Sequence, residues 1–126
     1  MAARPTSETL TLGGTPVLAL AAAGPPIAGE RDATDVIGDA FSVGAKLVAI
    51  PLARLTPEFL DLKTRVAGLI LQKFVNYGLR VAIVGSIAAE LIGSSALTDF
   101  VRESNRGKTV WFVADLADLE ARLVSA

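Results

Sequence analysis

The spacing of hydrophobic residues changes along the chain, and the changes predict alternating strands and helices. Apolar runs on both sides of Gly13-Gly14 favour a β-hairpin with strands at 9–12 and 17–21, because paired glycines adopt the positive φ angles of tight turns. A loop is expected at Ala22–Gly29. From Glu30 the apolar spacing becomes helical, which predicts an amphipathic helix that ends at Gly44. The residues expected on its buried face are Ala33, Val36, Ile37, Ala40 and Phe41.

Three short, uninterrupted apolar runs predict strands that are covered on both faces. They lie at 47–50, 81–84 and 110–113. The longest helix is expected within 57–77, with Gly78 placed to end it. A closing helix is marked by three leucines at helical spacing, which are Leu116, Leu119 and Leu123.

The helical stretch 87–100 contains the breaker Gly93-Ser94-Ser95, where a serine is suited to cap a restarted helix. Its second piece is expected at 96–103, before a turn at Asn105-Arg106-Gly107. The element order predicts an α/β fold of one domain over residues 1–126. The sheet is expected to have about five mostly parallel strands, with an N-terminal hairpin and helices packed on it.

Composition excludes several classes of protein. Hydrophobic residues make up 52% of the 126 residues, which excludes a disordered chain. The net charge of −1 argues against nucleic acid as a partner, because nucleic-acid binding needs a surplus of Lys and Arg. Neither Cys nor His is present, so disulfides, thiol catalysis, imidazole chemistry and Cys/His metal sites are excluded, and we expect no metal and no cofactor.

Residues 9–29 carry no charge, and a stretch of that length is enough for a membrane span. Pro16, Pro25, Pro26 and the Gly13-Gly14 pair interrupt it, however, so we expect no membrane contact. A secretory signal is disfavoured because Glu8 adjoins the stretch and Arg4 alone supplies positive charge. The expected location is the cytoplasm.

Around the axis of the long helix, one narrow stripe is polar and most of the remaining circumference is apolar. The stripe consists of Arg65, Gly68, Gln72 and Asn76, while Leu69 and Val75 belong to the apolar part. The apolar arc is wider than one sheet contact requires. The sequence leaves three explanations open: a central helix between sheet and neighbouring helix, a homodimer contact, or a ligand pocket.

Lys63 would lie on the apolar face if the long helix were continuous from Glu58, and a buried lysine is costly. We therefore expect regular helix to start near Thr64, after a turn at Asp61-Leu62-Lys63. Asp61, Lys63 and Thr64 then lie at a helix N-terminus, which favours a carboxylate or phosphate. The alternative is that Thr64 or Asp61 simply caps the helix.

The carboxyl ends of parallel strands are where ligands gather in such sheets. Here they are 51–54, Gly85-Ser86 and Asp115, and together with Asp61–Thr64 they are expected to form one polar rim. Gly85-Ser86 is either a weak phosphate-binding turn or an ordinary strand-to-helix turn, since no glycine-rich phosphate motif accompanies it. No paired-acid or Ser-Lys catalytic motif stands out, so the catalytic residues, if there are any, stay unknown.

Several sequence segments are too specific to be explained by amino-acid composition alone. They are Asp61-Leu62-Lys63-Thr64, the segments 71–77 and 82–85, Asp99-Phe100-Val101-Arg102-Glu103-Ser104-Asn105-Arg106-Gly107, and 110–115. With them nearly the whole chain resembles an uncharacterised bacterial family, the domain of unknown function 4180. The element order is more distantly similar to the STAS fold of sulphate transporters and anti-sigma-factor antagonists. That resemblance implies a regulatory or binding module, with Thr64 at the place of a phosphorylatable residue.

This chain departs from the family pattern at three positions. A glycine usually follows the threonine, an acid follows that glycine by four residues, and another acid follows the strand's glycine. Arg65, Leu69 and Ser86 occupy these positions here. The changes imply a less acidic, more apolar pocket, and hence an apolar small molecule as ligand.

We therefore expect a small regulatory or ligand- or partner-binding module with its polar site at the start of the long helix. The expected binding residues are Asp61, Lys63, Thr64, Arg65, Gln72, Asn76 and Ser86. A homodimer is expected, with a regulatory protein or an apolar small molecule as further partner. The alternative is a cyclase- or isomerase-type enzyme, with Lys63, Arg65, Lys73 or Tyr77 in an apolar pocket of about 300 Å³ or more.

Overall fold

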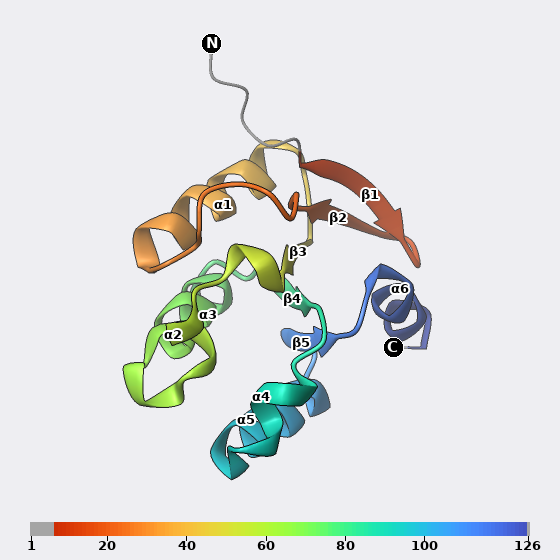
Figure 1. Cartoon of the computed structure of the whole chain (residues 1–126). Coiled ribbons are helices and arrows are strands. Elements are labelled where there is room, and N and C mark those ends of the chain that lie inside the picture. The colour runs from red at the N-terminus through yellow and green to blue at the C-terminus, as the bar shows by residue number, and fades with distance from the viewer. Residues whose placement is uncertain (1–6, 126) are drawn as a thin grey trace.

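Five strands form one sheet in the order β1-β2-β3-β4-β5 in the computed structural model, which describes residues 7–125. β1 and β2 are the antiparallel hairpin, and β2 through β5 run parallel (Figure 1). The strands are β1 Glu8–Leu12, β2 Thr15–Ala19, β3 Leu47–Pro51, β4 Arg80–Val84 and β5 Val110–Val113. This arrangement confirms the predicted α/β class with a five-stranded, mostly parallel sheet.

Six α-helices and two 3₁₀ turns connect the strands in the described part of the chain. They are α1 Glu30–Ser42, η1 Leu52–Arg54, α2 Pro57–Leu60, η2 Leu62–Thr64, α3 Val66–Asn76, α4 Ala88–Ile92, α5 Ser95–Arg106 and α6 Leu116–Ser125. The long apolar segment is therefore interrupted before α3, as the position of Lys63 predicts. The break between α4 and α5 is also where the sequence predicts it, because the Ser94 side chain accepts a hydrogen bond from the Leu97 amide at 3.0 Å.

Alternate residues of each strand point to opposite faces of the sheet, and the two faces are covered unequally. Val48 and Ile83 belong to the larger core, which includes buried residues of α1 and α3. Ala49 and Trp111 belong to the smaller core, whose buried helical residues are Leu119 and Leu123 of α6. Figure 1 shows α6 apart from the other helices, on its own side of the sheet.

Some details differ from the sequence-based expectation. Phe41 was expected in the core, but 52% of it is exposed, because it lies at the end of α1 and packs edge-to-face on Tyr77 with ring centroids 6.3 Å apart. Leu116 is likewise partly exposed at the start of α6. The second hairpin strand ends at Ala19, two residues before the apolar run does.

The turn expected at Asn105-Arg106-Gly107 is also wrong, because α5 continues to Arg106 and Gly107 follows it as the C-cap. The Asn105 side chain instead binds the backbone of Phe112 in β5. Its Oδ1 accepts a hydrogen bond from the Phe112 amide at 2.7 Å, and its Nδ2 donates to the Phe112 carbonyl at 3.3 Å. The last turn of α5 is thereby fixed to β5.

The uncharged stretch 9–29 forms the hairpin and the following loop. No helix in residues 7–125 is long and apolar enough to cross a membrane.

Candidate functional site

A groove with a volume of about 680 Å³ lies between α1 and the hairpin. We call it the α1 groove. It is lined by Ser7, Thr9, Leu18, Leu20, Pro25, Pro26, Ile27, Asp32, Asp35, Val36, Asp39, Ser42, Val43 and Arg54. This volume lies within the range of small-molecule sites, about 300–1,000 Å³.

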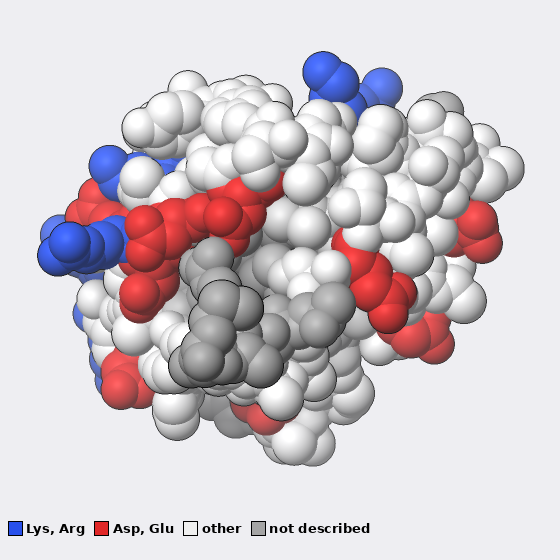
Figure 2. Space-filling model, turned by 90° about the horizontal axis from the view of Figure 1, so that it is seen from above, with Lys and Arg blue, Asp and Glu red and all other residues white. Residues whose placement is uncertain are grey.

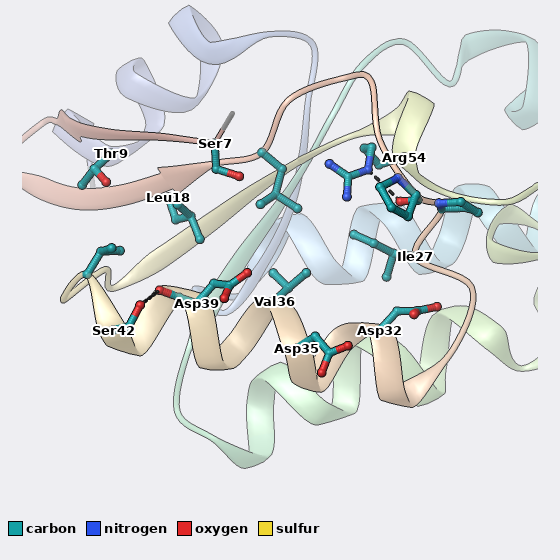
Figure 3. Close-up of a pocket in the computed structure, with 14 residues that line it drawn as sticks. Ser7, Thr9, Leu18, Ile27, Asp32, Asp35, Val36, Asp39, Ser42 and Arg54 are labelled. Carbon is teal, nitrogen blue, oxygen red and sulfur yellow. Dashed lines mark hydrogen bonds between the residues drawn. The ribbon is translucent and has the colours of Figure 1, made fainter. Parts of the chain in front are cut away.

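Apolar side chains form one part of the α1 groove and aspartates form another. Leu18, Ile27 and Val36 are buried core residues whose side chains also line the groove. Asp35 and Asp39 are exposed and line the groove together with Val36. Asp39 lies four residues after Asp35 and three after Val36, and residues at these spacings are neighbours on a helix surface. Figure 3 shows the aspartates following one another along α1, and Figure 2 shows acidic side chains gathered in a row on this face of the molecule.

The aspartates differ in what they already bind. One Asp32 oxygen accepts a hydrogen bond from the Ala28 amide at 2.9 Å, so it holds the end of the loop before α1. Among residues 7–125, no salt bridge involves Asp35 or Asp39. Their charge is therefore open to a cation that enters the groove.

Arg54 bounds the opposite side of the α1 groove but is bound to backbone. Its Nε donates to the Pro25 carbonyl at 2.9 Å and its Nη1 donates to the Ala21 carbonyl at 3.0 Å (Figure 3). The sequence placed Arg54 on a rim with Asp61–Thr64. In the structure it fixes the loop that walls the groove, and the backbone bridge between Ile27 and Leu55 holds the same loop.

The predicted site at the start of α3 is a closed local network. The Thr64 hydroxyl lies 2.6 Å from the Glu58 carbonyl and 2.7 Å from the Asp61 carbonyl, so its single proton is shared between them. The same oxygen accepts from the Val66 amide at 3.3 Å. Asp61 Oδ1 accepts from the Lys63 amide at 3.2 Å. Asp61 therefore caps η2, as the capping alternative predicts, and Thr64 binds the first amide of α3.

Arg65 joins η2 to α3 in the left-handed conformation, with φ of 64°. It is the only residue other than glycine with positive φ among those described. A glycine adopts this conformation without the steric conflict that a Cβ creates. The glycine that the family resemblance implies at this position would therefore avoid this steric conflict.

The remaining predicted residues are exposed: Gln72 and Asn76 lie further along α3, and Ser86 follows β4. Gln72 Nε2 donates to Asn76 Oδ1 along α3 at 2.8 Å. Ser86 follows Gly85, which packs against Leu52 of η1. No hydrogen bond among residues 7–125 joins Ser86 to Asp61 or Thr64, and none of the seven predicted residues lines the α1 groove.

Sequence reasoning missed the α1 groove because its walls come from five separate segments. Its one local signal is the spacing of Asp32, Asp35 and Asp39, which puts three acids beside Val36 on one stripe of α1. Taken alone, that spacing predicts only a solvent-exposed helix face.

The comparisons with curated proteins and with solved structures found no match. The family model described as "Domain of unknown function (DUF4180)" matches residues 12–123, from the end of β1 to the last turn of α6. The hairpin turn, the α1 groove's helix and the α3 start all lie inside this range. The chain therefore belongs to the DUF4180 family.

Proposed function

We propose that the protein is a small regulatory or ligand-binding module and that the α1 groove takes the ligand. The observation that supports this is a hollow of about 680 Å³ that combines apolar walls with two carboxylates engaged in no salt bridge within residues 7–125. These features favour a small molecule with an apolar body and a positively charged end. The apolar body contacts Leu18, Ile27 and Val36, and the charged end approaches Asp35 and Asp39.

The carboxylates are exposed, so each contributes modestly to affinity. An exposed ion pair stabilises by about 0.2–1 kcal/mol, which changes a dissociation constant by up to about fivefold. The apolar contact supplies the rest. A charged ligand should therefore bind better than its neutral counterpart by a measurable but moderate factor.

Calorimetric titration with a panel of aryl-alkyl amines and their N-acetylated neutral counterparts tests the proposal. We expect the amines to bind saturably and several-fold more tightly than the acetylated compounds. The double substitution Asp35→Asn/Asp39→Asn should remove this preference, whereas Glu120→Gln on α6 should keep it. Absence of saturable binding by any amine, or an equal preference in the double variant, would contradict the proposal.

A second contact point is proposed at the start of α3, where Asp61, Lys63, Thr64 and Arg65 are exposed. Its support is the resemblance to STAS modules, in which a residue at the place of Thr64 is phosphorylated. Incubation with cell extract and ATP, followed by intact-mass measurement of the wild type and of Thr64→Val, tests this role. A phosphate adduct that the variant lacks is the expected result, and its absence from the wild type would count against it.

We also propose self-association through the exposed apolar residues of α3, with the cytoplasm as the site of action. Leu69 is 49% exposed and Val75 is 44% exposed, which leaves part of the wide apolar arc uncovered. Light scattering should return about twice 13.1 kDa, and Leu69→Glu should restore the monomer mass. A monomer mass for the unmodified chain would contradict the dimer.

The alternative that the protein is a cyclase- or isomerase-type enzyme stays a prediction. The polar residues named for it, Lys63, Arg65, Lys73 and Tyr77, do not line the α1 groove.

A further inference from the structure

A second hollow lies between the end of α5, the start of β5 and α6. Its volume is about 370 Å³. We call it the Trp111 pocket; its lining residues are Asn105, Arg106, Gly107, Lys108, Trp111, Ala121, Arg122 and Ser125. Three of the eight are cations and none is an acid. The chain as a whole carries a net charge of −1, so this concentration of positive charge does not follow from composition.

A fourth cation, Arg80 at the start of β4, adjoins the pocket. The guanidinium carbons of Arg80 and Arg122 lie 4.6 Å and 4.7 Å from the Trp111 ring centroid. The electron-rich ring attracts both cations and fixes their positions. The Trp111 ring is itself held, because its Nε1 donates to the Gly107 carbonyl at 2.7 Å.

The two stacked arginines bind backbone carbonyls instead of carboxylates. Arg80 Nε donates to the Lys108 carbonyl at 2.7 Å, and Arg122 Nη2 donates to the Asn105 carbonyl at 2.7 Å. A carbonyl satisfies a donor but does not neutralise its charge. Burial lowers the pKa of Arg80 by removing water from its charged form, which is the cost of holding this cation without an anionic partner.

The C-terminus of α5 accounts for only part of this arrangement. Its unpaired carbonyls carry a partial charge of about −0.5, which favours cations nearby. The one acidic side chain that pairs with a cation of the pocket, among residues 7–125, is Glu103, 3.3 Å from Arg106 with both side chains about 70% exposed. Four cations against one exposed carboxylate and a partial dipole leave an excess of positive charge.

We propose that the Trp111 pocket binds a small molecule through a phosphate group. Phosphate carries a charge of about −1.5 to −2 at neutral pH and suits a site with several cations better than a single carboxylate does. The exposed Arg106 and Lys108 approach the phosphate, and Arg80 and Arg122 supply a fixed positive field behind them. This site goes beyond the α1 groove and does not depend on it.

The pocket's size and its tryptophan favour a small ligand over a nucleic acid. Single-stranded nucleic acids bind through bases stacked on exposed aromatic rings. Trp111 is only 4% exposed and its ring already carries two guanidinium groups, so it offers no stacking surface.

Trp111 is the single tryptophan of the chain, so its fluorescence reports directly on this pocket. Pyrophosphate, used as the probe in phosphate-free buffer at constant ionic strength, should give a saturable change in fluorescence, with calorimetry as a second readout. Lys108→Gln and Arg106→Gln should each raise the dissociation constant by about fivefold. Arg102→Gln, which removes another exposed cation of α5 that lies outside the pocket, is the matched control and should leave the dissociation constant unchanged.

The outcomes separate the sources of phosphate. Saturation by glycerol phosphate as well as by pyrophosphate supports a small phosphorylated ligand. Tighter binding of vesicles containing phosphatidic acid, or of a single-stranded oligoribonucleotide, would overturn the small-molecule assignment. No saturable signal in either readout, or an equal loss of affinity in Arg102→Gln and Lys108→Gln, would overturn the site itself. Asp35→Asn/Asp39→Asn leaves the Trp111 pocket intact. A failure of the phosphate-site proposal can therefore be distinguished from a failure of the α1-groove proposal.

Discussion

Replacing Arg65 with glycine should stabilise the protein. Arg65 has φ of 64° at the junction between η2 and α3. Its side chain is exposed and takes part in no hydrogen bond or salt bridge among residues 7–125. The substitution therefore removes a backbone strain without removing a contact.

The size of the effect follows from two opposing contributions. A residue with a Cβ pays about 1–2 kcal/mol for the left-handed conformation, and glycine does not. Glycine, in turn, has more freedom in the unfolded chain, which costs about 0.4–1 kcal/mol. The net expectation is a gain of about 0.5–1 kcal/mol in the free energy of unfolding, which for a chain of this length raises Tm by about 2–4 °C.

Urea denaturation followed by circular dichroism measures the change directly. The midpoint should rise while the slope m stays constant, because the surface exposed on unfolding is unaltered. Arg65→Ala is the control, since it removes the same side chain but keeps a Cβ, and it should leave stability within about 0.5 kcal/mol of the wild type. A destabilised Arg65→Gly, or equal gains in the two variants, would refute the role assigned to the backbone.

Four further substitutions test other parts of the structure by the same denaturation assay. Thr64→Val should cost about 1 kcal/mol, because the Glu58 and Asp61 carbonyls lose a shared donor; an unchanged midpoint would contradict the capping role. Gly85→Ala should cost about 2 kcal/mol or more, since its φ is 145° and a Cβ would lie 2.9 Å from the Leu52 Cβ. Gly14→Ala, where φ is also positive but the space is open, should cost only about 1 kcal/mol, and equal losses would exclude the steric contribution. Asn105→Ala should cost about 1–3 kcal/mol by leaving the Phe112 amide and carbonyl without their side-chain partner, and the loss should appear in hydrogen exchange at Phe112.

Much of the fold could be predicted because it depends on local patterns. The apolar runs at 47–50 and 81–84 are strands, and Lys63 marks the interruption before α3 because its charge does not fit an apolar helix face. Ser94 caps α5 through its own side chain. In each case the physical cause lies within a few residues of the element it determines.

The candidate sites depend on distant residues, and the sequence pattern does not contain them. The α1 groove combines Leu18, Ile27 and Val36 with Arg54, and only tertiary packing brings these side chains together. Arg54 was assigned to a strand-end rim by topology, yet its bonds to Ala21 and Pro25 are set by the path of a loop.

The same limit applies to the Trp111 pocket. Arg80 and Arg122 are 42 residues apart, and no spacing rule places both on one indole. The prediction that Phe41 is buried was wrong for a related reason. Helical periodicity identifies which face of a helix is apolar, but not how far the neighbouring element extends over that face.

The amide of Asn105 has a consequence for how this molecule meets other chains. An outer strand invites strand addition through its unpaired backbone groups, and a protein with two such margins can polymerise end to end. At β5 the Phe112 pair is already occupied by a side chain that imitates a neighbouring strand. A strand added beside β5 would have to displace the Asn105 amide from Phe112, whereas β1 Glu8–Leu12, at the other margin of the sheet, pairs only with β2.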